Sequence, residues 1–449
     1  MIPYKFKEKK KTYILILIFA VIVTFILSGI IFYSSFAYYE EKKNFDVING
    51  QTEEPGDIYF TYYIDGTISR DMPNQNTGYT LDKEKSGCNN DVSINWNDSI
   101  WHADIDYSKY SDTSNTRTKC TLYFSKTSKT VSTVLGNIEV NSYTPDFAKS
   151  ACDDDTCESH ERGIYETDDC DGNPTYYYRG SVENNYVKFA GYYWRIIRIN
   201  SNGSVRMIYD GTVAHENGES SEDRQYNASR FNIGSDDNIY VGYMYTSGSA
   251  NGTQISSVIK TSVDKFYTDK LNDYTSKLDI NAGFCGDRST LNLQSGVGTG
   301  TVTTYYKPYL RIEESTPTLV CENTNDYYTV SSASSGNKAL TYPIGLITAD
   351  EVMLAGHGGG VFDGIYGHMK SNMGSYLATG NWFWTMTPAG GYNLYGVNYW
   401  NVLGFVVDSS GRFDDSSVYN PTSFRPVINI RSDVTVTGSG TKNDPYLVN

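Results

Sequence analysis

The sequence predicts an α+β fold of antiparallel hairpins with two helices, joined to a small all-β sandwich and one N-terminal transmembrane helix. The first observation is a series of short apolar runs from Asn381 to Ile430, separated by Pro, Gly and Asp turn signals. The second is a Trp-Arg-Ile-Ile-Arg-Ile strand at 194–199, which an Asn-Ser-Asn-Gly turn returns as a hairpin. The third is a pair of helical patterns, one over 256–278 and one that opens at Thr348.

Composition places the chain among acidic, tyrosine-rich globular proteins. Its 449 residues suffice for two or three domains, and 39% hydrophobic with 14% aromatic residues suffice for a substantial core. Tyrosine occurs 40 times, against 18 phenylalanines and 6 tryptophans, which reflects either an AT-rich genome or a tyrosine-rich recognition surface. The net charge of −15 argues against nucleic acid as a partner, because phosphate binding needs a basic patch.

The first 55 residues predict a membrane segment and a stalk. Residues 1–12 form a basic tail with five lysines, and residues 13–33 are 21 residues without a charge, long enough for a helix to cross a bilayer core. The basic tail predicts a single-pass membrane protein with its N-terminus inside and its ectodomain outside the cell. Ser35 and Ala37 offer the alternative of a cleaved secretory signal, although its apolar region would be long. Under either interpretation the rest of the chain is exported, beginning with a polar stalk at 34–55.

The pattern of residues 56–127 is typical of a β-sandwich of immunoglobulin-like size. Ile58–Ile64 is a candidate strand that ends at Asp65-Gly66, a hairpin turn signal, and further short alternating runs come after it. Cys88 and Cys120 bracket these strands, and an exported domain this small gains stability from a disulfide. We therefore expect these two cysteines to be bonded to each other.

An acidic connecting region spans residues 128–174. It contains Cys152, Cys157 and Cys170 among aspartates, but it lacks the regular spacing of an EF-hand calcium loop. We favour a solvated acidic linker with a local disulfide over a calcium loop. The chain has seven cysteines, so after two other pairs these three share one bond, and the sequence leaves open which of them pair.

Two helices are expected among the hairpins of the C-terminal part. The segment 256–278 has apolar residues mostly three and four apart, which is the spacing of an amphipathic helix. Thr348 and Glu351 form a capping box that opens the second helix. Cys285 and Cys321 fall between the two helices, and we expect them to form a disulfide.

Tryptophans mark the expected core. Trp382 and Trp384 stand two apart, as on one face of a strand, and Trp194 faces inward from its hairpin. Pro388 and the two glycines that come soon after it should break the strand. Arg425 lies in a strand setting before a proline, so we expect it to form a structural ion pair inside the fold rather than to act in catalysis.

Several segments of residues 175–449 match a known pattern. A Trp-Thr-x-Thr-Pro strand from Trp384 is followed by a Gly-rich turn and an Arg-Pro-Val-Ile-Asn closing strand from Arg425, and Asn-Asn-Tyr-Val-x-Phe and Trp-Arg-Ile-Ile-Arg-Ile precede them. In these segments the chain resembles uncharacterised bacterial surface domains related to the formylglycine-generating-enzyme and C-type-lectin-like fold. The resemblance implies a C-type-lectin-like domain with two helices in this order, and it extends more loosely over residues 55–175.

The resemblance does not bring an activity with it. Formylglycine-generating enzymes work through a cysteine pair in the last third of their fold, and this chain has no cysteine after Cys321. The Glu-Pro-Asn and Gln-Pro-Asp tripeptides of calcium-dependent lectins are also absent from the sequence. His357 and His368 flank a glycine run, but zinc would need a third ligand, so we expect histidines of a surface loop. The sequence therefore predicts no catalytic residue, no metal site and no cofactor.

We expect a membrane-anchored bacterial surface protein whose C-type-lectin-like domain binds an extracellular protein or glycan without catalysing a reaction. An enzyme of the formylglycine-generating type with altered chemistry is one alternative, and a structural subunit of an envelope assembly is another. Long loops on a stiff sheet are where such folds place binding, and three segments qualify: Gly211–Asp237, Gly286–Pro308 and Gly356–Gly380.

Four aromatic residues are the expected contacts with the ligand. They lie in the Gly- and Asn-rich segment 390–401, where a mobile backbone would leave aromatic rings exposed to stack on a sugar or anchor a partner. The alternative is that these residues cap the core. The four are Tyr392, Tyr395, Tyr399 and Trp400.

Overall fold

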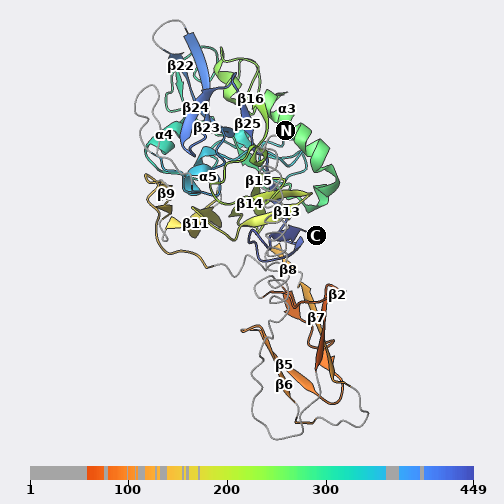
Figure 1. Ribbon diagram of the computed structural model, residues 1–449. Coiled ribbons are helices and arrows are strands. Elements are labelled where there is room, and N and C mark those ends of the chain that lie inside the picture. The colour runs from red at the N-terminus through yellow and green to blue at the C-terminus, as the bar shows by residue number, and fades with distance from the viewer. Residues whose placement is uncertain are drawn as a thin grey trace, which may run out of the picture. The chain divides into compact units, whose positions relative to one another are not determined.

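The structure is a computed structural model (Figure 1), and the predicted transmembrane segment at 13–33, with the tail and stalk around it, lies outside the residues that it describes. Among the described residues, no helix has both the length and the apolar character needed to cross a bilayer. The described residues are 58–74, 79–98, 100–106, 108–109, 117–126, 129–131, 139–153, 156–157, 161–169, 172–359, 374–394 and 399–448.

The predicted α+β class is wrong, because the part of the chain that the structure describes is mostly β, with 37% of the described residues in strands and 13% in helices. The helix expected over 256–278 forms for only 13 residues, as α3 (Val258–Lys270), before a 3-10 segment succeeds it. The capping box of Thr348 and Glu351 is present, but helix α5 (Ala349–Leu354) lasts only six residues. The predicted C-type-lectin-like α+β arrangement is therefore wrong. Pairing between strands dominates the architecture, rather than packing around two helices.

The segment from residue 58 to residue 126 forms two small sheets with a core of their own. The expected hairpin at Asp65-Gly66 is present, and β1 also pairs in parallel with β7. The disulfide Cys88–Cys120 is confirmed. The five-stranded sheet contains β1 (Tyr59–Ile64), β2 (Thr67–Ser69), β3 (Tyr79–Leu81), β4 (Gly87–Cys88) and β7 (Lys119–Lys126), and β5 (Ser93–Asn97) pairs with β6 (His102–Asp106).

A nine-stranded sheet lies at the centre of the larger part of the chain, and it includes the hairpin expected at 194–209. There Trp194 pairs with Tyr209 across β14 and β15, which lie beside β13 (Figure 1). The strands are β11 (Gly163–Asp168), β12 (Pro174–Arg179), β13 (Tyr186–Phe189), β14 (Tyr192–Ile199), β15 (Val205–Gly211), β26 (Val427–Ile430), β27 (Thr435–Thr437), β28 (Tyr446–Val448) and β8 (Lys129–Thr130).

A second, six-stranded sheet carries the C-terminal strands, apart from 427–430, which joins the first sheet. Its strand order is β16-β25-β22-β23-β24, and β20 pairs with β22 outside that path. The strands are β16 (Tyr226–Arg230), β20 (Thr304–Tyr305), β22 (Phe383–Leu394), β23 (Tyr399–Val407), β24 (Phe413–Ser417) and β25 (Pro421–Phe424).

Short elements complete the fold. The expected disulfide Cys285–Cys321 is confirmed. Cys152 and Cys157 lie opposite each other in the backbone register of one short hairpin, and Cys170 lies outside the described residues. The elements are α4 (Lys307–Glu313), the 3-10 helices η2 (Glu222–Arg224), η3 (Asn238–Val241), η4 (Asn272–Lys277) and η5 (Thr324–Asp326), and the strand pairs β9 (Cys152–Asp153) with β10 (Thr156–Cys157), β17 (Met244–Tyr245) with β18 (Ile255–Ser256), and β19 (Phe284–Cys285) with β21 (Tyr327–Tyr328).

Two of the three tryptophans expected in the core are buried there. Trp194 and Trp384 are 0% exposed, and the indole N–H of Trp384 donates to the carbonyl oxygen of Ser229 at 2.9 Å. The prediction for Trp382 is wrong, because its side chain is 40% exposed. The physical reason is that β22 begins at Phe383, so Trp382 precedes the strand and the alternation of strand faces does not apply to it.

Arg425 belongs to a fully buried cluster of three arginines around one carboxylate. Its Nη2 lies 2.7 Å from Asp210 Oδ1, and Arg224 Nη2 lies 2.9 Å from the same oxygen. Arg195 is farther away, with Nη1 3.9 Å from Asp210 Oδ2. Other N–H groups of Arg224 and Arg425 donate to the carbonyl oxygens of residues 376–378, and Arg425 Nε donates to the carbonyl oxygen of Tyr209. The cluster therefore links β15, η2 and the end of β25 to the segment that leads into β22.

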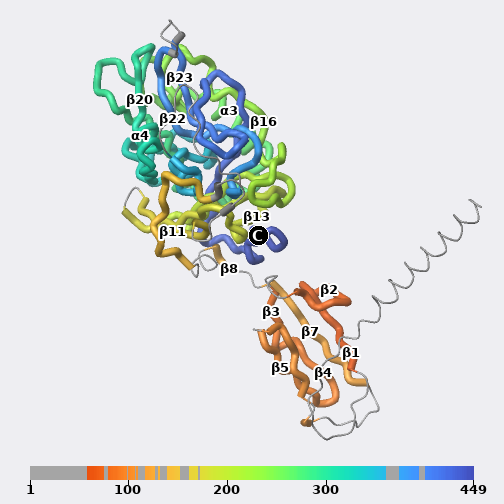
Figure 2. The backbone as a smooth tube through the Cα atoms, turned by 60° about the vertical axis from the view of Figure 1, so that its left-hand side comes forward, coloured from red at the N-terminus to blue at the C-terminus, as the bar shows by residue number. Residues whose placement is uncertain are grey.

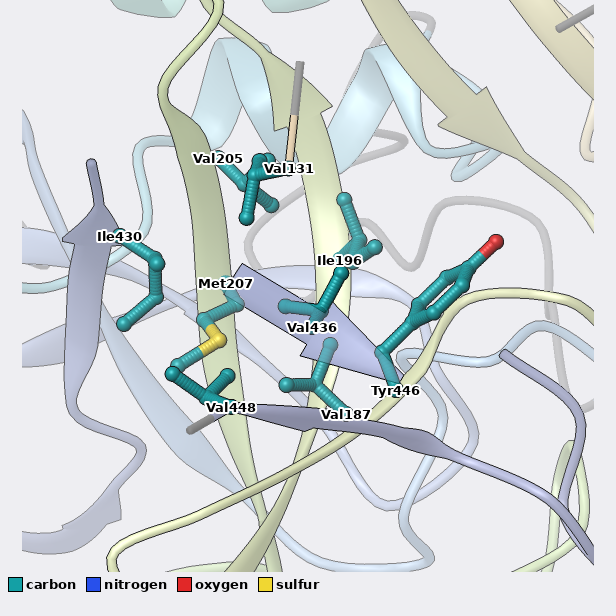
Figure 3. Close-up of a pocket in the computed structure, with 9 residues that line it drawn as sticks. All are labelled: Val131, Val187, Ile196, Val205, Met207, Ile430, Val436, Tyr446 and Val448. Atoms are coloured by element: carbon teal, nitrogen blue, oxygen red, sulfur yellow. The ribbon is translucent and has the colours of Figure 1, made fainter. Parts of the chain in front are cut away.

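One part of the nine-stranded sheet surrounds a small apolar pocket (Figure 3). Side chains of β13, β14, β15, β26, β27 and β28 converge on it, among them Ile196, Met207 and Val436. The hydroxyl group of Tyr446 points away from this interior. Because ligand sites combine apolar walls with a few polar groups that orient the ligand, we interpret this pocket as part of the core.

Candidate binding surface

The hairpin of β22 and β23 positions the candidate site, and it is longer than the sequence predicts. Pairing continues through the glycines, with Gly391 opposite Val402, and in place of the predicted break the register shifts once on each side of Pro388. A Cβ atom at Gly391 would lie 1.8 Å from the side-chain oxygen of Asn238. The glycine therefore allows η3 to pack closely against the strand instead of ending it.

The four aromatic residues predicted to bind the ligand do not form one surface. Tyr392 pairs with Asn401 and Trp400 pairs with Asn393, so Tyr392 and Trp400 point to opposite faces of the hairpin. Trp400 packs against the main core, and its indole N–H is buried without a hydrogen-bond partner among the described residues. Tyr395 lies outside the described residues. Tyr399 is described only as the first residue of β23.

Other aromatic residues surround Tyr392 instead. Tyr305 on β20 stacks on Tyr392 with ring centroids 6.2 Å apart, because β20 pairs with β22 at Gly390. Helix α4 comes directly after β20, and its Tyr309 stacks on Phe405 of β23 with centroids 6.1 Å apart. Figure 2 shows β20 and α4 beside β22 and β23. The segment of β20 and α4 and the hairpin of β22 and β23 thus bring their aromatic rings to one face of the sheet.

Asp415 on β24 adds a carboxylate to the same face. It pairs with Phe405, and directly opposed residues of antiparallel strands point to the same side. Burial, and then the charge of Asp414, raise the pKa of Asp415 to about 6. Burial and then Asp415 raise the pKa of Tyr392, while burial, Glu313 and Asp415 raise that of Tyr309. We call Tyr305, Tyr309, Tyr392 and Asp415 the Tyr–Asp surface.

The Tyr–Asp surface is accessible at its edge. Tyr305 is 45% exposed, and the two leucines of the preceding loop, Leu291 and Leu293, are 39% and 95% exposed. The backbone N–H of Leu291 donates to the carbonyl oxygen of Tyr305 at 2.9 Å, so this leucine lies directly beside the tyrosine. The expected binding loop Gly286–Pro308 therefore contributes to the site. Of the predicted aromatic residues whose side chains are described, Tyr392 contributes to it and Trp400 does not.

This surface combines aromatic rings with a carboxylate. Tyrosine rings offer faces on which a sugar or a cation can stack, and a carboxylate offers a counter-charge. Within the described part of the chain, no three His, Cys, Asp or Glu side chains are grouped to hold a metal ion. The sequence did contain a signal for Asp415, because two adjacent aspartates interrupt a strand pattern, but nothing in it showed which tyrosines would lie beside them.

His357, predicted in a surface loop, is buried. Its Nδ1 lies 2.5 Å from the carbonyl oxygen of Gly411, and its Nε2 has no hydrogen-bond partner among the described residues. The second predicted loop histidine, His368, lies outside those residues. Burial lowers the pKa of His357 to about 4, so this imidazole is neutral at physiological pH.

We expect acidic pH to lower the free energy of unfolding because His357 becomes protonated on unfolding. The variant His357→Gln should lack this contribution to the pH dependence. The unfolded state binds a proton below pH 6.5, whereas the folded state does so only near pH 4. The unfolding free energy should therefore fall by roughly 3–4 kcal/mol as the pH drops through this window, at about 1.4 kcal/mol per pKa unit. Urea unfolding of both proteins at several pH values measures the effect, and identical pH profiles would contradict it.

Asp415 should act in the opposite direction, so that Asp415→Asn raises the unfolding free energy at pH 7 by about 1–2 kcal/mol. The folded state holds a proton up to about pH 6, and the unfolded state releases it near pH 3.8. The stability that this group contributes is complete below pH 3.8 and is lost as the pH rises through 6. Urea unfolding at pH 3.5 and pH 7 tests this, and a variant less stable than the parent at pH 7 would refute it.

Comparison of the chain with models of known protein families, with curated proteins and with solved structures finds no match.

Proposed function

We propose that this chain is an exported binding protein that holds an extracellular protein or glycan at the Tyr–Asp surface. The observation that carries the proposal is the combination of two features: Asp415, a carboxylate whose burial disfavours its charged form, and the exposed Tyr305 ring, which stacks on the half-buried Tyr392 ring of the paired strand. A buried ionisable group that costs stability is typical of a functional site. Long strands and a helix support the rings, so the surface is already ordered before a ligand arrives.

Export is supported by the cysteine chemistry. The two disulfides, Cys88–Cys120 and Cys285–Cys321, are bonds that persist in oxidising compartments and are rare in the cytosol. The acidic net charge of −15 is compatible with a protein exposed to solvent at a cell surface.

The location predicts the outcome of proteolysis on intact cells. Protease added outside should degrade the chain from residue 58 onward, because export places those residues outside the membrane. A cytosolic marker protein in the same cells controls for leakage. Full protection of the chain while the cells remain intact would show that it is not exported to the surface.

The binding function is tested with arrays of extracellular proteins and glycans, probed with the full chain in detergent. Tyr305→Ala and Tyr392→Ala should lose the signals that the parent protein gives, because each removes a ring of the stacked pair. Tyr274→Ala is the matched control, since Tyr274 is 39% exposed and lies on η4, outside the surface. If all three variants keep the parent's signals, binding does not occur at the Tyr–Asp surface.

A further inference from the structure

We propose that the Tyr–Asp surface binds a lysine or arginine side chain of a protein partner, with the Asp415 carboxylate as its counter-charge and the tyrosine rings as its walls. This inference rests on the proposed function, and it narrows the ligand from a protein or glycan to a cationic protein segment.

The first support is the lack of a cation at Asp415. Two buried aspartates of the described residues have one: Asp326 pairs with Arg288 at 2.6 Å, and Asp408 pairs with Arg412 at 2.7 Å. No Lys, Arg or His of the described residues forms an ion pair with Asp415, although it sits in a half-buried strand beside a second acidic residue. A ligand cation would supply the charge that the chain itself does not.

The second support is the arrangement of the rings. The Tyr305 and Tyr392 rings are inclined by only 23° to each other, and the Tyr309 and Phe405 rings by 27°. The two stacks lie on the same face of the sheet as Asp415, whose charge acts on Tyr392 and Tyr309, and Tyr305 exposes its ring at the edge of this face. An ammonium or guanidinium group gains energy over the face of such a ring within about 6 Å of its centre. The chain uses this contact elsewhere, where Arg230 lies 3.8 Å over the Tyr419 ring.

The third support is the surrounding surface, which favours a protein over a sugar. Leu291 lies beside Tyr305, and both it and Leu293 of the same loop are exposed, so they offer apolar contacts at the edge of the surface. A basic residue beside an apolar residue in a peptide would satisfy both the carboxylate and the leucines. A neutral glycan would gain nothing from the negative charge, whereas a cationic segment is attracted both by Asp415 and by the net charge of −15.

The test is saturation-transfer NMR on the full chain in detergent micelles, with three probes. Nα-acetyl-lysine methylamide carries the cation, Nα-acetyl-norleucine methylamide has a similar apolar chain without it, and lactose represents a neutral glycan. We expect the lysine probe to bind at least fivefold more tightly than the norleucine probe. Asp415→Asn should weaken the lysine probe about five- to tenfold, and its affinity should increase from pH 5 to pH 7 as the carboxyl group ionises.

The matched control is Asp433→Asn, which removes an exposed carboxylate on another part of the chain and should leave the affinity unchanged. Equal binding of the lysine and norleucine probes, no binding of the lysine probe, or unchanged affinity in Asp415→Asn would each overturn the inference. If lactose binds, is lost in Tyr392→Ala and is retained in Asp415→Asn, the proposed binding function stands with a glycan ligand and only the cationic assignment fails. Because Asp415→Asn is expected to be more stable than the parent, unfolding does not explain a loss of binding.

Discussion

Asp210→Ala should lower the free energy of unfolding by roughly 3–5 kcal/mol, enough to unfold many domains of this kind. The substitution removes the carboxylate that Arg224 and Arg425 share and leaves their guanidinium groups buried without it. Burial already lowers the pKa of Arg425 to about 9, and Asp210 is the first influence that opposes this change. Urea unfolding monitored by tryptophan fluorescence measures the loss.

An exposed ion pair provides the control for this prediction. Asp433 pairs with Arg431, and their side chains are 64% and 49% exposed, so Asp433→Ala should change the free energy of unfolding by less than about 1 kcal/mol. If Asp210→Ala is as mild as Asp433→Ala, the buried arginines must be neutralised by something other than Asp210, and this carboxylate is not the centre of the cluster.

Trp384→Ala should lower the free energy of unfolding by roughly 3–5 kcal/mol through the cavity that it leaves. The ring is 0% exposed, its N–H donates to the carbonyl oxygen of Ser229, and it lies edge-on to Phe231 with centroids 5.5 Å apart. Removing it also leaves that buried carbonyl oxygen without its donor, which adds to the loss. Thermal unfolding monitored by circular dichroism at several scan rates measures the change.

The neighbouring tryptophan is the natural control. Trp382 stands two residues earlier and is 40% exposed, so Trp382→Ala should cost less than about 1 kcal/mol. The comparison isolates burial, because residue type and location in the chain are nearly the same. Equal losses in the two variants would mean that Trp382 is part of a packed core, in contradiction to its exposure.

These two tryptophans show that the spacing of apolar residues does not predict where a strand begins. Their spacing suggested one shared face, but whether a strand has begun at Trp382 depends on which partners are available for hydrogen bonding. Phe383 is the first residue with such partners, namely Val407 and Ser423. The glycines at 390 and 391 misled in the same way, because Gly391 serves close packing against Asn238 and does not end the strand.

The candidate surface was visible in the sequence only in fragments. The sequence predicts Tyr392 as a contact with the ligand. It also predicts that the loop with Leu291, Leu293 and Tyr305 takes part in binding. Asp415 and Tyr309 were not expected, because strand pairing between β23 and β24 and the packing of α4 bring them to Tyr392 from distant parts of the chain. Trp400 was expected beside Tyr392, yet the register of the hairpin turns it to the other face.

The features that could be predicted from the sequence depend on neighbouring residues or on two cysteines that bracket a segment. They are the hairpin turns at Asp65 and at 200–203, the capping box of Thr348, and the disulfides Cys88–Cys120 and Cys285–Cys321. Turn and cap chemistry acts over a few residues, so it is written locally. The mostly β class, the buried arginine cluster and the Tyr–Asp surface could not be predicted in this way and became evident from the folded chain. Each of these arises from pairing or burial between residues far apart in the chain, and the energy of such contacts depends on register and exclusion of water, which no local pattern encodes.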